Sequence, residues 1–262
     1  MSSPPAFELS DVELVEQGRV VLHELSWSAR QEDRWVVLGP NGSGKTSILR
    51  LLSFTRAPSR GRVTVIGDTY GEVDVRRGRR RIGLASSALL QRLRPTLSAH
   101  DVVVMGADAS LEPWWSTYDD DQHARADALL DMVGCAGHSG QELATLSEGE
   151  RKRVLVARVL MAEPELLLFD EPCAGLDLGG REALVAVLAE LAQAGDRPLV
   201  LVTHHLEEIP AGITHALLLR GGRVLSAGPV ADTLTSAAVS DTFGVDVAVE
   251  GDAGRWFARF VR

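Results

Sequence analysis

The sequence predicts an α/β domain built around a mostly parallel β-sheet. Short apolar segments alternate with helical patterns through much of the chain, as expected for parallel strands joined by helices. Two of these segments, residues 166–172 and 198–205, are almost entirely apolar and end in polar residues. Central parallel strands have this composition because both faces are buried, and ligands bind beyond their carboxyl ends. We therefore expect functional side chains at the ends of these two strands.

The other elements predicted from the sequence agree with an α/β domain. The chain is helical in pattern from Ser98 to Met161, beginning with a Ser-x-x-Asp cap, and a hairpin is expected to turn at Gly221 and Gly222. Further strands are predicted at residues 34–39, 61–68 and 80–86, and a helix at 46–54. The whole chain, 1–262, is then a single domain with a core of residues 7–97 and 162–228, a helical subdomain of residues 98–161 and a tail of residues 229–262.

Composition excludes several classes of protein. The net charge of −9 argues against a general nucleic-acid or anionic-membrane binder, so no direct nucleic-acid partner is expected. The first ten residues lack the basic and apolar regions of a secretory signal, and no apolar run approaches the length of a membrane span. Two cysteines, Cys135 and Cys173, fit neither a disulfide framework nor a four-ligand zinc site. We expect a cytoplasmic protein that meets a membrane only through a partner.

A glycine-rich loop between a predicted strand and a predicted helix carries a phosphate-binding pattern. The segment GPNGSGKT matches G-x-x-x-x-G-K-[ST], and the alternative of a simple turn is weakened because the chain has only two lysines, Lys45 and Lys152. Backbone N–H groups are expected to surround the phosphates, Lys45 to reach the β- and γ-phosphates, and Thr46 to ligate Mg²⁺. The predicted nucleotide-binding residues are Gly39, Pro40, Asn41, Gly42, Ser43, Gly44, Lys45, Thr46 and Ser47.

The two strand ends supply candidate catalytic groups. Asp170 and Glu171 are neighbours, so their side chains diverge, and we assign Asp170 to Mg²⁺ and Glu171 to the attacking water as general base. Two solvated charges at a strand terminus would be the simpler interpretation without the phosphate loop. A histidine at the end of a buried strand is more often structural, but the position of His204 after the acidic strand favours a catalytic role. His205 is expected at the surface.

A second helix start has the features of an anion site. In LSEGERKR, Ser147 and Glu150 form a capping-box pattern, and Gly149 lies in the first turn, where glycine costs roughly 0.5–1 kcal/mol relative to alanine. Helix N-termini with small residues bind anions, because free N–H groups and the positive end of the dipole point outward. The phosphate loop of the same chain lies far upstream, so the anion in question is a separate one.

Taken together, the order of these motifs from about Phe7 to about Gly228 resembles the ATP-binding subunits of ABC transporters. The resemblance implies a P-loop NTPase fold of ABC type with an N-terminal antiparallel β subdomain and an inserted helical subdomain. It implies that Ser147 and Gly149 belong to the signature motif that binds ATP held by a second copy of the chain, and that Asp177 lies in the loop crossing the interface. The implied activity is hydrolysis of ATP with Mg²⁺, coupled to a separate integral membrane permease at the inner face of the cell membrane.

Several positions depart from the family pattern. Val15, Glu16 and Gln17 stand where the resemblance implies an aromatic residue stacked on adenine. Ser87 occupies the place of the usual metal-sensing glutamine, with Gln91 as a candidate substitute. Two rival functions stay open, a non-transport ABC ATPase for repair, iron–sulfur assembly or translation, and a low-turnover nucleotide-dependent regulator. The transported substrate and its direction are not determined by the sequence.

Two further segments are open to more than one interpretation. The run of arginines from Arg76 to Arg81 is expected to be a solvated edge before a strand, and a nucleic-acid patch is the less favoured alternative. Trp114 and Trp115 are expected to form either an exposed contact for a partner or a local core.

Overall fold

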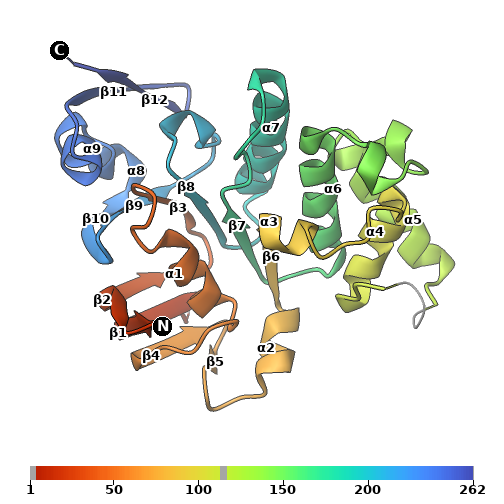
Figure 1. Ribbon diagram of the computed structural model, residues 1–262, viewed down its shortest axis with the longest axis horizontal. Coiled ribbons are helices and arrows are strands. Elements are labelled where there is room, and N and C mark those ends of the chain that lie inside the picture. The colour runs from red at the N-terminus through yellow and green to blue at the C-terminus, as the bar shows by residue number, and fades with distance from the viewer. Residues whose placement is uncertain (1–3, 113–116, 262) are drawn as a thin grey trace.

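The computed structural model describes residues 4–112 and 117–261, so Trp114 and Trp115 lie outside the described residues. The central sheet is six-stranded in the order β10-β9-β3-β8-β7-β6, and five of its strands are parallel, with β10 antiparallel at one edge (Figure 1). This confirms the predicted α/β class. Its strands are β3 (Arg34–Leu38), β6 (Ile82–Ser86), β7 (Leu166–Asp170), β8 (Leu199–Thr203), β9 (His215–Arg220) and β10 (Arg223–Pro229).

A second, antiparallel sheet of four strands is formed by segments that lie before and after β3 in the chain. Its order is β2-β1-β4-β5, with strands β1 (Phe7–Glu16), β2 (Arg19–Ala29), β4 (Arg60–Val65) and β5 (Asp68–Thr69). Helix α1 (Lys45–Leu52) packs between the two sheets, because its apolar side chains join a buried cluster that includes residues of β1, β2, β3 and β8. Alternate residues of β3 enter separate cores: Trp35 and Val37 face α1, and Val36 and Leu38 face the helical side.

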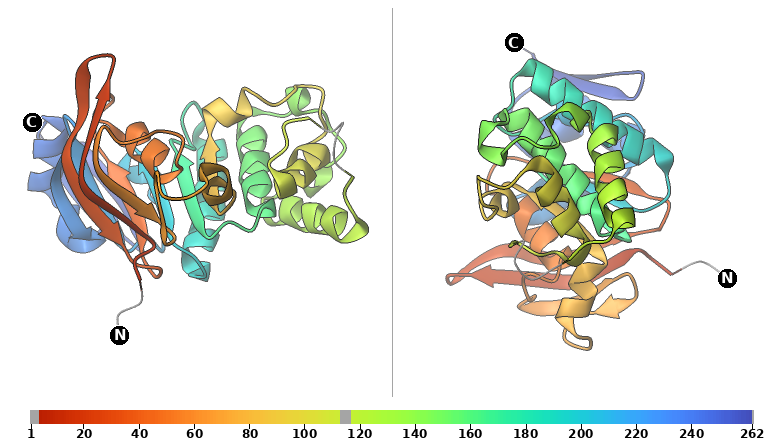
Figure 2. Two further views of the ribbon diagram at one scale, coloured as in Figure 1. Left: turned by 90° about the horizontal axis from the view of Figure 1, so that it is seen from below. Right: turned by 90° about the vertical axis from the view of Figure 1, so that its right-hand side faces the viewer.

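The helical segment projects from the end of the molecule that lies opposite the antiparallel sheet (Figure 2). It consists of α4 (Ala99–Val104), α5 (Asp120–Met132) and α6 (Glu148–Met161), with short 3₁₀ turns at Met105–Asp108, Ala136–His138 and Leu143–Thr145. The predicted cap at Ser98 is present, since its hydroxyl accepts a hydrogen bond from the N–H of Asp101 at 3.0 Å. Helix α7 (Leu178–Ala194) packs against α6, and in the chain it lies between strands β7 and β8 of the central sheet. The boundaries proposed for core and helical subdomain stay a prediction.

Two short helices lie beside the end strand β6. The arginine run expected as an edge forms α2 (Val75–Arg80), whose Arg79 binds the carbonyl of Phe54 at 2.6 Å. The residues after β6 form α3 (Ser87–Leu90), capped by Ser86. The predicted hairpin between β9 and β10 turns at Gly221 and Gly222, where the φ angles are 53° and 74°.

The last residues are ordered against the core. They form α8 (Val230–Thr233), α9 (Ser236–Phe243) and a separate hairpin of β11 (Val247–Asp252) and β12 (Arg255–Phe260). The side chains of Val247, Val249 and Trp256 pack on the main core cluster. No helix within the described ranges is long and apolar enough to cross a membrane.

Candidate functional site

The glycine-rich loop follows β3 and requires its glycines. A Cβ at Gly39 would lie 2.1 Å from the carbonyl oxygen of Leu219, and one at Gly44 would lie 2.7 Å from Cδ2 of Leu22. Gly42 and Gly44 have φ angles of 79° and 105°, which L side chains rarely adopt. Close packing and the left-handed backbone together hold this loop in a curved form.

The start of α1 offers unused hydrogen-bond donors. Its N-cap is Gly44, so no side chain caps the helix, and the first N–H groups keep their capacity for a ligand. The hydroxyl of Ser43 in the same loop is buried without a hydrogen-bond partner. Buried polar atoms are nearly always paired in native proteins, so this orphaned hydroxyl fits a loop shaped for an acceptor such as phosphate.

Lys45 is buried at the first position of α1. Its Nζ donates to the carbonyl oxygens of Gly39 at 2.8 Å and Pro40 at 3.1 Å, and lies 3.6 Å from Oε1 of Glu171. Burial lowers the pKa of the Lys45 ammonium, and the nearby Glu171 carboxylate opposes that effect. The loop therefore holds a cation over its own carbonyl groups, ready for an anionic ligand.

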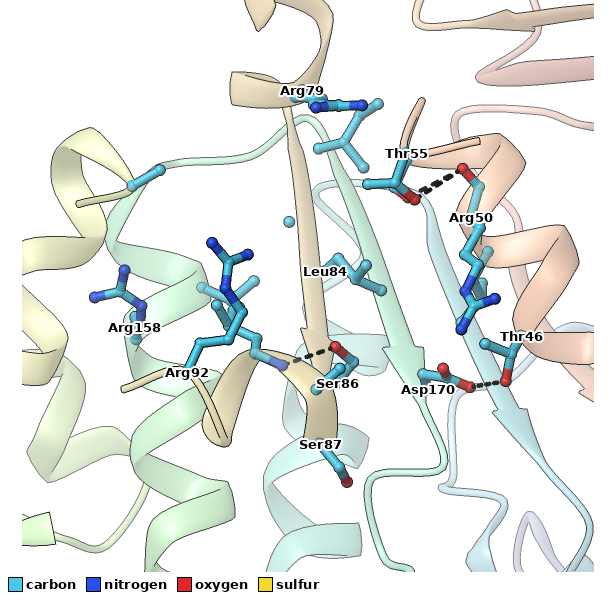
Figure 3. A pocket seen from close by; sticks show the side chains of 18 of the residues that line it. Thr46, Arg50, Thr55, Arg79, Leu84, Ser86, Ser87, Arg92, Arg158 and Asp170 are labelled. Atoms are coloured by element: carbon cyan, nitrogen blue, oxygen red, sulfur yellow. Dashed lines mark hydrogen bonds between the residues drawn. The ribbon is translucent and has the colours of Figure 1, made fainter. Parts of the chain in front are cut away.

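Thr46 and Asp170 form an oxygen pair across the site. The Thr46 hydroxyl donates to Oδ1 of Asp170 at 3.0 Å, joining the start of α1 to the end of β7 (Figure 3). Burial is the main cause that raises the pKa of Asp170. A partly buried carboxylate beside a hydroxyl is a donor set suited to Mg²⁺, which prefers oxygen ligands and would offset the cost of desolvating the charge. These residues therefore fit the predicted metal ion.

Glu171 stands immediately after β7 in a strained conformation. Its φ angle is 46°, and its N–H is held by the carbonyl of Val202 at 2.9 Å. Left-handed backbone at a residue other than glycine costs energy of order 1–3 kcal/mol and is found preferentially at functional sites. The His204 ring places Nδ1 3.3 Å from Oε1 of Glu171, so β7 and β8 bring the two predicted catalytic groups together. His205 instead lies near Glu207, with Nδ1 3.6 Å from Oε1.

The start of α6 lies at the surface and has the predicted capping box. The Ser147 N–H donates to Oε2 of Glu150 at 2.7 Å, and the Glu150 N–H donates to Oγ of Ser147 at 3.3 Å. A Cβ at Gly149 would meet no atom nearer than 3.4 Å, the Cα of Gly180, which is ordinary contact. Packing within the chain therefore does not require glycine at this position.

Asp177 caps the start of α7 next to this surface. Its Oδ1 accepts a hydrogen bond from the N–H of Gly180 at 2.7 Å, and the following Leu178 is 67% exposed. Because Gly180 is the nearest neighbour of Gly149, the Asp177 loop and the signature segment adjoin in one chain. Within residues 4–112 and 117–261, no hydrogen bond or ion pair links Ser147 or Gly149 to the phosphate loop. The predicted site residues thus form two groups on one subunit.

The structure also shows what surrounds the positions that depart from the family pattern. Glu16 at the tip of the β1–β2 hairpin pairs with Arg56, with Oε1 and Nε 3.4 Å apart, and so lies beside the end of α1. Ser87 lines a cavity with Thr46 and Asp170, and it also lines a second cavity together with Gln91, Leu143 and Glu148. The role of Gln91 as a substitute for the metal-sensing glutamine stays a prediction.

Two features of the site were not anticipated. A cavity of about 620 Å³ opens between α1, β6 and α6, and Figure 3 shows arginines around it, with Arg50 on one side, Arg92 and Arg158 on the other, and Arg79 at the top of the view. Lys152 is buried in α6 and donates to the carbonyl of Ala174, between β7 and α7. Only the scarcity of lysine marked Lys152 in the sequence, and the cavity has no local sequence signal.

A glycine loop with a buried lysine, joined through a threonine to a strand-end carboxylate, defines a P-loop nucleoside triphosphatase. Among family models, the one described as ABC transporter matches residues 22–174. The ABC transporter ATP-binding protein YlmA of Bacillus subtilis (strain 168) is 36% identical, and the match covers 95% of both chains. The nickel import ATP-binding protein NikO of Rhodobacter capsulatus is 32% identical over 90% of this chain and 93% of its own.

The chain belongs to the ABC transporter family as an ATP-binding subunit, and its family hydrolyses ATP. The solved structure of cbiO1 from Clostridium perfringens, part of the ABC transporter complex cbiONQ, superposes with a TM-score of 0.78 at 23% identity, covering 91% of this chain and 94% of that one. This likeness confirms the fold. A function outside transport, the rival considered from the sequence, is not supported by these relatives.

Proposed function

We propose that two copies of this chain associate head to tail and enclose two ATP molecules, each with Mg²⁺, in composite sites. One copy contributes Lys45 and Glu171 to each site, and the other contributes Ser147 and Gly149. Asp177 lies in the loop that crosses the interface. This arrangement accounts for two phosphate-binding segments that do not meet within one subunit.

The exposed start of α6 is the observation that carries this proposal. Gly149 lies where helix propensity disfavours it and where an alanine side chain would fit the chain's own packing. A glycine that neither local structure nor packing demands is explained by the close approach of something outside the subunit. The phosphates of a nucleotide held by the other copy fit that place, because α6 presents its N-terminus there.

Each residue of the proposed site has a separate role in ATP hydrolysis. Lys45 moves its charge from the loop carbonyls to the β- and γ-phosphates. Thr46 and Asp170 would hold Mg²⁺, and the ion would supply positive charge beside the phosphates when bound. Glu171 accepts a proton from the attacking water as general base. His204 lies at the Glu171 carboxylate and orients it and the γ-phosphate. The backbone of Glu171 is already constrained by its bond to Val202, which limits reorganisation during turnover.

Complementation between two defective variants tests the composite site. Lys45→Ala and Ser147→Arg are each expected to abolish ATP-driven association, the first by removing phosphate charge compensation and the second by blocking the start of α6. A mixture can form a heterodimer in which one site carries both defects and the other carries neither. We expect light scattering, with Mg²⁺ withheld, to show ATP-dependent association only in the mixture.

The control is a mixture of Ser147→Arg with Arg19→Ala, a surface change at the tip of the β1–β2 hairpin. The Arg19 variant alone is expected to associate normally. If the Lys45 and Ser147 variants together associate no better than either alone, the composite site is wrong and Ser147 is only a helix cap.

We further propose that the cavity beside β6 receives a segment of the membrane permease, which places the subunit at the cytoplasmic face. The cavity lies between the nucleotide-binding core and the helical segment, and Asp170 and Ser87 line it, so an occupant would contact the reacting region. The exposed Arg50 and Arg92 favour a segment that carries acidic residues, whereas Arg158 is buried and bound to backbone carbonyls. Relatives are named for import of nickel and of cobalt, and these differing cargoes support import without identifying the substrate.

Filling the cavity tests this docking site. Ala88→Trp in α3 is expected to leave ATP hydrolysis by the isolated subunit unchanged and to abolish stimulation by a permease isolated together with the native chain. Ala231→Trp in α8, away from the cavity lining, is the matched control. Normal stimulation of the Ala88 variant would place the permease elsewhere.

A further inference from the structure

The C-terminal hairpin lies against the turn that follows His204. Strands β11 and β12 pair only with each other among the described strands, and β12 contacts the 3₁₀ turn η5 (Leu206–Glu208). The tip of the hairpin also approaches this region, since a Cβ at Gly254 would lie 3.3 Å from Cβ of Ala211. A segment that contributes nothing to the phosphate loop is thus packed beside a predicted catalytic residue.

Arg255 makes the polar contacts of this hairpin with the core. Its NH1 donates to Oε2 of Glu182 at 2.9 Å, and its NH2 donates to Oε1 of Glu182 at 3.2 Å and to the carbonyl oxygen of Glu207 at 2.8 Å. The hydrogen bond from Arg255 is the main cause that lowers the pKa of Glu182. A bidentate guanidinium–carboxylate pair fixes orientation as well as distance. The Arg255 side chain is only 25% exposed, so solvent competes little for it.

The two partners of Arg255 belong to two different functional segments. Glu182 is in the first turns of α7, the helix that Asp177 caps, and Glu207 lies three residues after His204. A second arginine strengthens this link, because Arg181 lies 3.5 Å from Glu182 through Nε and 3.5 Å from Glu207 through NH1. One guanidinium therefore joins the helix behind the interface loop to the turn behind the catalytic histidine.

We infer that Arg255 is a positioning residue, and that the C-terminal hairpin sets the relative placement of His204 and the Asp177 loop during ATP hydrolysis. The contact from His204 to Glu171 measures 3.3 Å, so a shift of the following turn by a fraction of an ångström would break it. Arg255 fixes that turn through the Glu207 carbonyl. The inference rests on the roles proposed above for His204 and Asp177.

The first experiment compares Arg255→Gln with Arg259→Gln in the full chain. Arg259 is a matched control on the same strand, since it pairs with Glu250 of the hairpin at 2.9 Å and its side chain is 70% exposed. For Arg255→Gln we expect kcat to fall roughly ten- to a hundredfold, the scale of a small misplacement, while KM for ATP stays within about twofold. KM is preserved because the phosphate loop is not touched. Arg259→Gln is expected to match the native chain.

Substitutions at the two members of the pair separate positioning from loss of folding. Glu182→Gln keeps an oxygen acceptor for Arg255 and leaves the contact with the Glu207 carbonyl in place, so its kcat is expected to fall less than that of Arg255→Gln. Arg255→Lys keeps a charged donor and is expected to fall between the native chain and Arg255→Gln. Native kcat in Arg255→Gln, a rise in KM with unchanged kcat, or a larger loss of kcat in Glu182→Gln than in Arg255→Gln would each overturn the inference.

His204→Ala tests the proposed role of His204 separately from the role of Arg255. If that variant hydrolyses ATP at the native rate, the proposed role of His204 fails and the inference falls with it. If His204→Ala is slow while Arg255→Gln is native, only the role of Arg255 is wrong.

Discussion

Two helix N-termini in this subunit, those of α1 and α6, leave backbone N–H groups without partners within the helix, and they differ in how those groups are capped. Helix α1 begins at Gly44 with no side-chain cap, in a loop that also holds the buried Ser43 hydroxyl without a hydrogen-bond partner. Helix α6 begins at the exposed Ser147 with a complete capping box. The start of α1 therefore leaves its first donors without a side-chain cap, whereas the start of α6 satisfies part of its own donors and carries the half-buried Gly149.

The difference indicates which start binds phosphate within the subunit and which one adds to a site formed elsewhere. A buried donor without a partner, such as the Ser43 hydroxyl, is costly until a ligand arrives, so the loop before α1 gains most from a nucleotide. The capped start of α6 satisfies part of its donors without a ligand. Under the proposed function, the first start is the subunit's own nucleotide site and the second is a surface for the other copy.

The largest expected effect lies on the α1 side, where the reacting groups converge. Glu171→Gln is expected to keep ATP affinity and to lower turnover by roughly 10²–10⁴-fold, the usual contribution of a positioned general base. Phosphate release and equilibrium binding of a fluorescent ATP analogue measure the two quantities. Hydrolysis near the native rate would remove Glu171 from this role and leave the α1 side without its proposed base.

Backbone geometry should make the α1 loop intolerant of a side chain. Gly44→Ala places a Cβ at a φ of 105° and 2.7 Å from Leu22, so we expect the free energy of unfolding to fall by roughly 1–3 kcal/mol. Urea denaturation measures the loss. A variant as stable as the native chain would show that the loop can adopt another conformation.

The same substitution at α6 should have the opposite effect on stability. Gly149→Ala lies in a helix with room for Cβ, so we expect the free energy of unfolding to rise by roughly 0.5–1 kcal/mol. ATP-driven association should nevertheless weaken, because the added methyl group approaches the partner's phosphates. Association unchanged alongside higher stability would contradict the function proposed for Gly149.

The smallest effect concerns the cap itself and depends on pH. Hydrogen bonds from the Ser147 N–H, foremost, and from its hydroxyl lower the pKa of Glu150 below the unfolded value of 4.5. The carboxylate therefore stabilises the fold above that unfolded value, and the contribution is lost as pH falls through the lower folded pKa. Glu150→Ala is expected to cost about 0.3–1 kcal/mol at pH 7 and progressively less in acid. Urea midpoints for both chains across pH 3–7 measure the difference, and a constant gap would show that the effect is not electrostatic.

Patterns within a few residues of one another were readable from the sequence because their physical causes are local. The glycine loop, the Ser147 capping box and the Gly221–Gly222 turn each depend on conformations of adjacent residues. The placement of Asp170 and Glu171 after a buried strand followed from apolar composition alone. Resemblance to a known family added the meaning of Gly149 and Asp177, which local chemistry left open.

The tertiary structure decided which of these pieces meet. Because β7 lies beside β8, and β8 beside β3, the ends of distant segments converge, and His204 reaches Glu171 while Lys45 reaches it from the loop after β3. The left-handed backbone of Glu171 has no sequence signature, and neither has the contact from Arg255 to Glu182. Spacing alone made Gln91 a candidate for the metal site, and in the structure it lines a cavity that Ser87 also lines. Sequence spacing determines contacts between residues within about one turn of a helix or two positions of a strand. Contacts between residues farther apart in the chain depend on the order of the strands in the sheet.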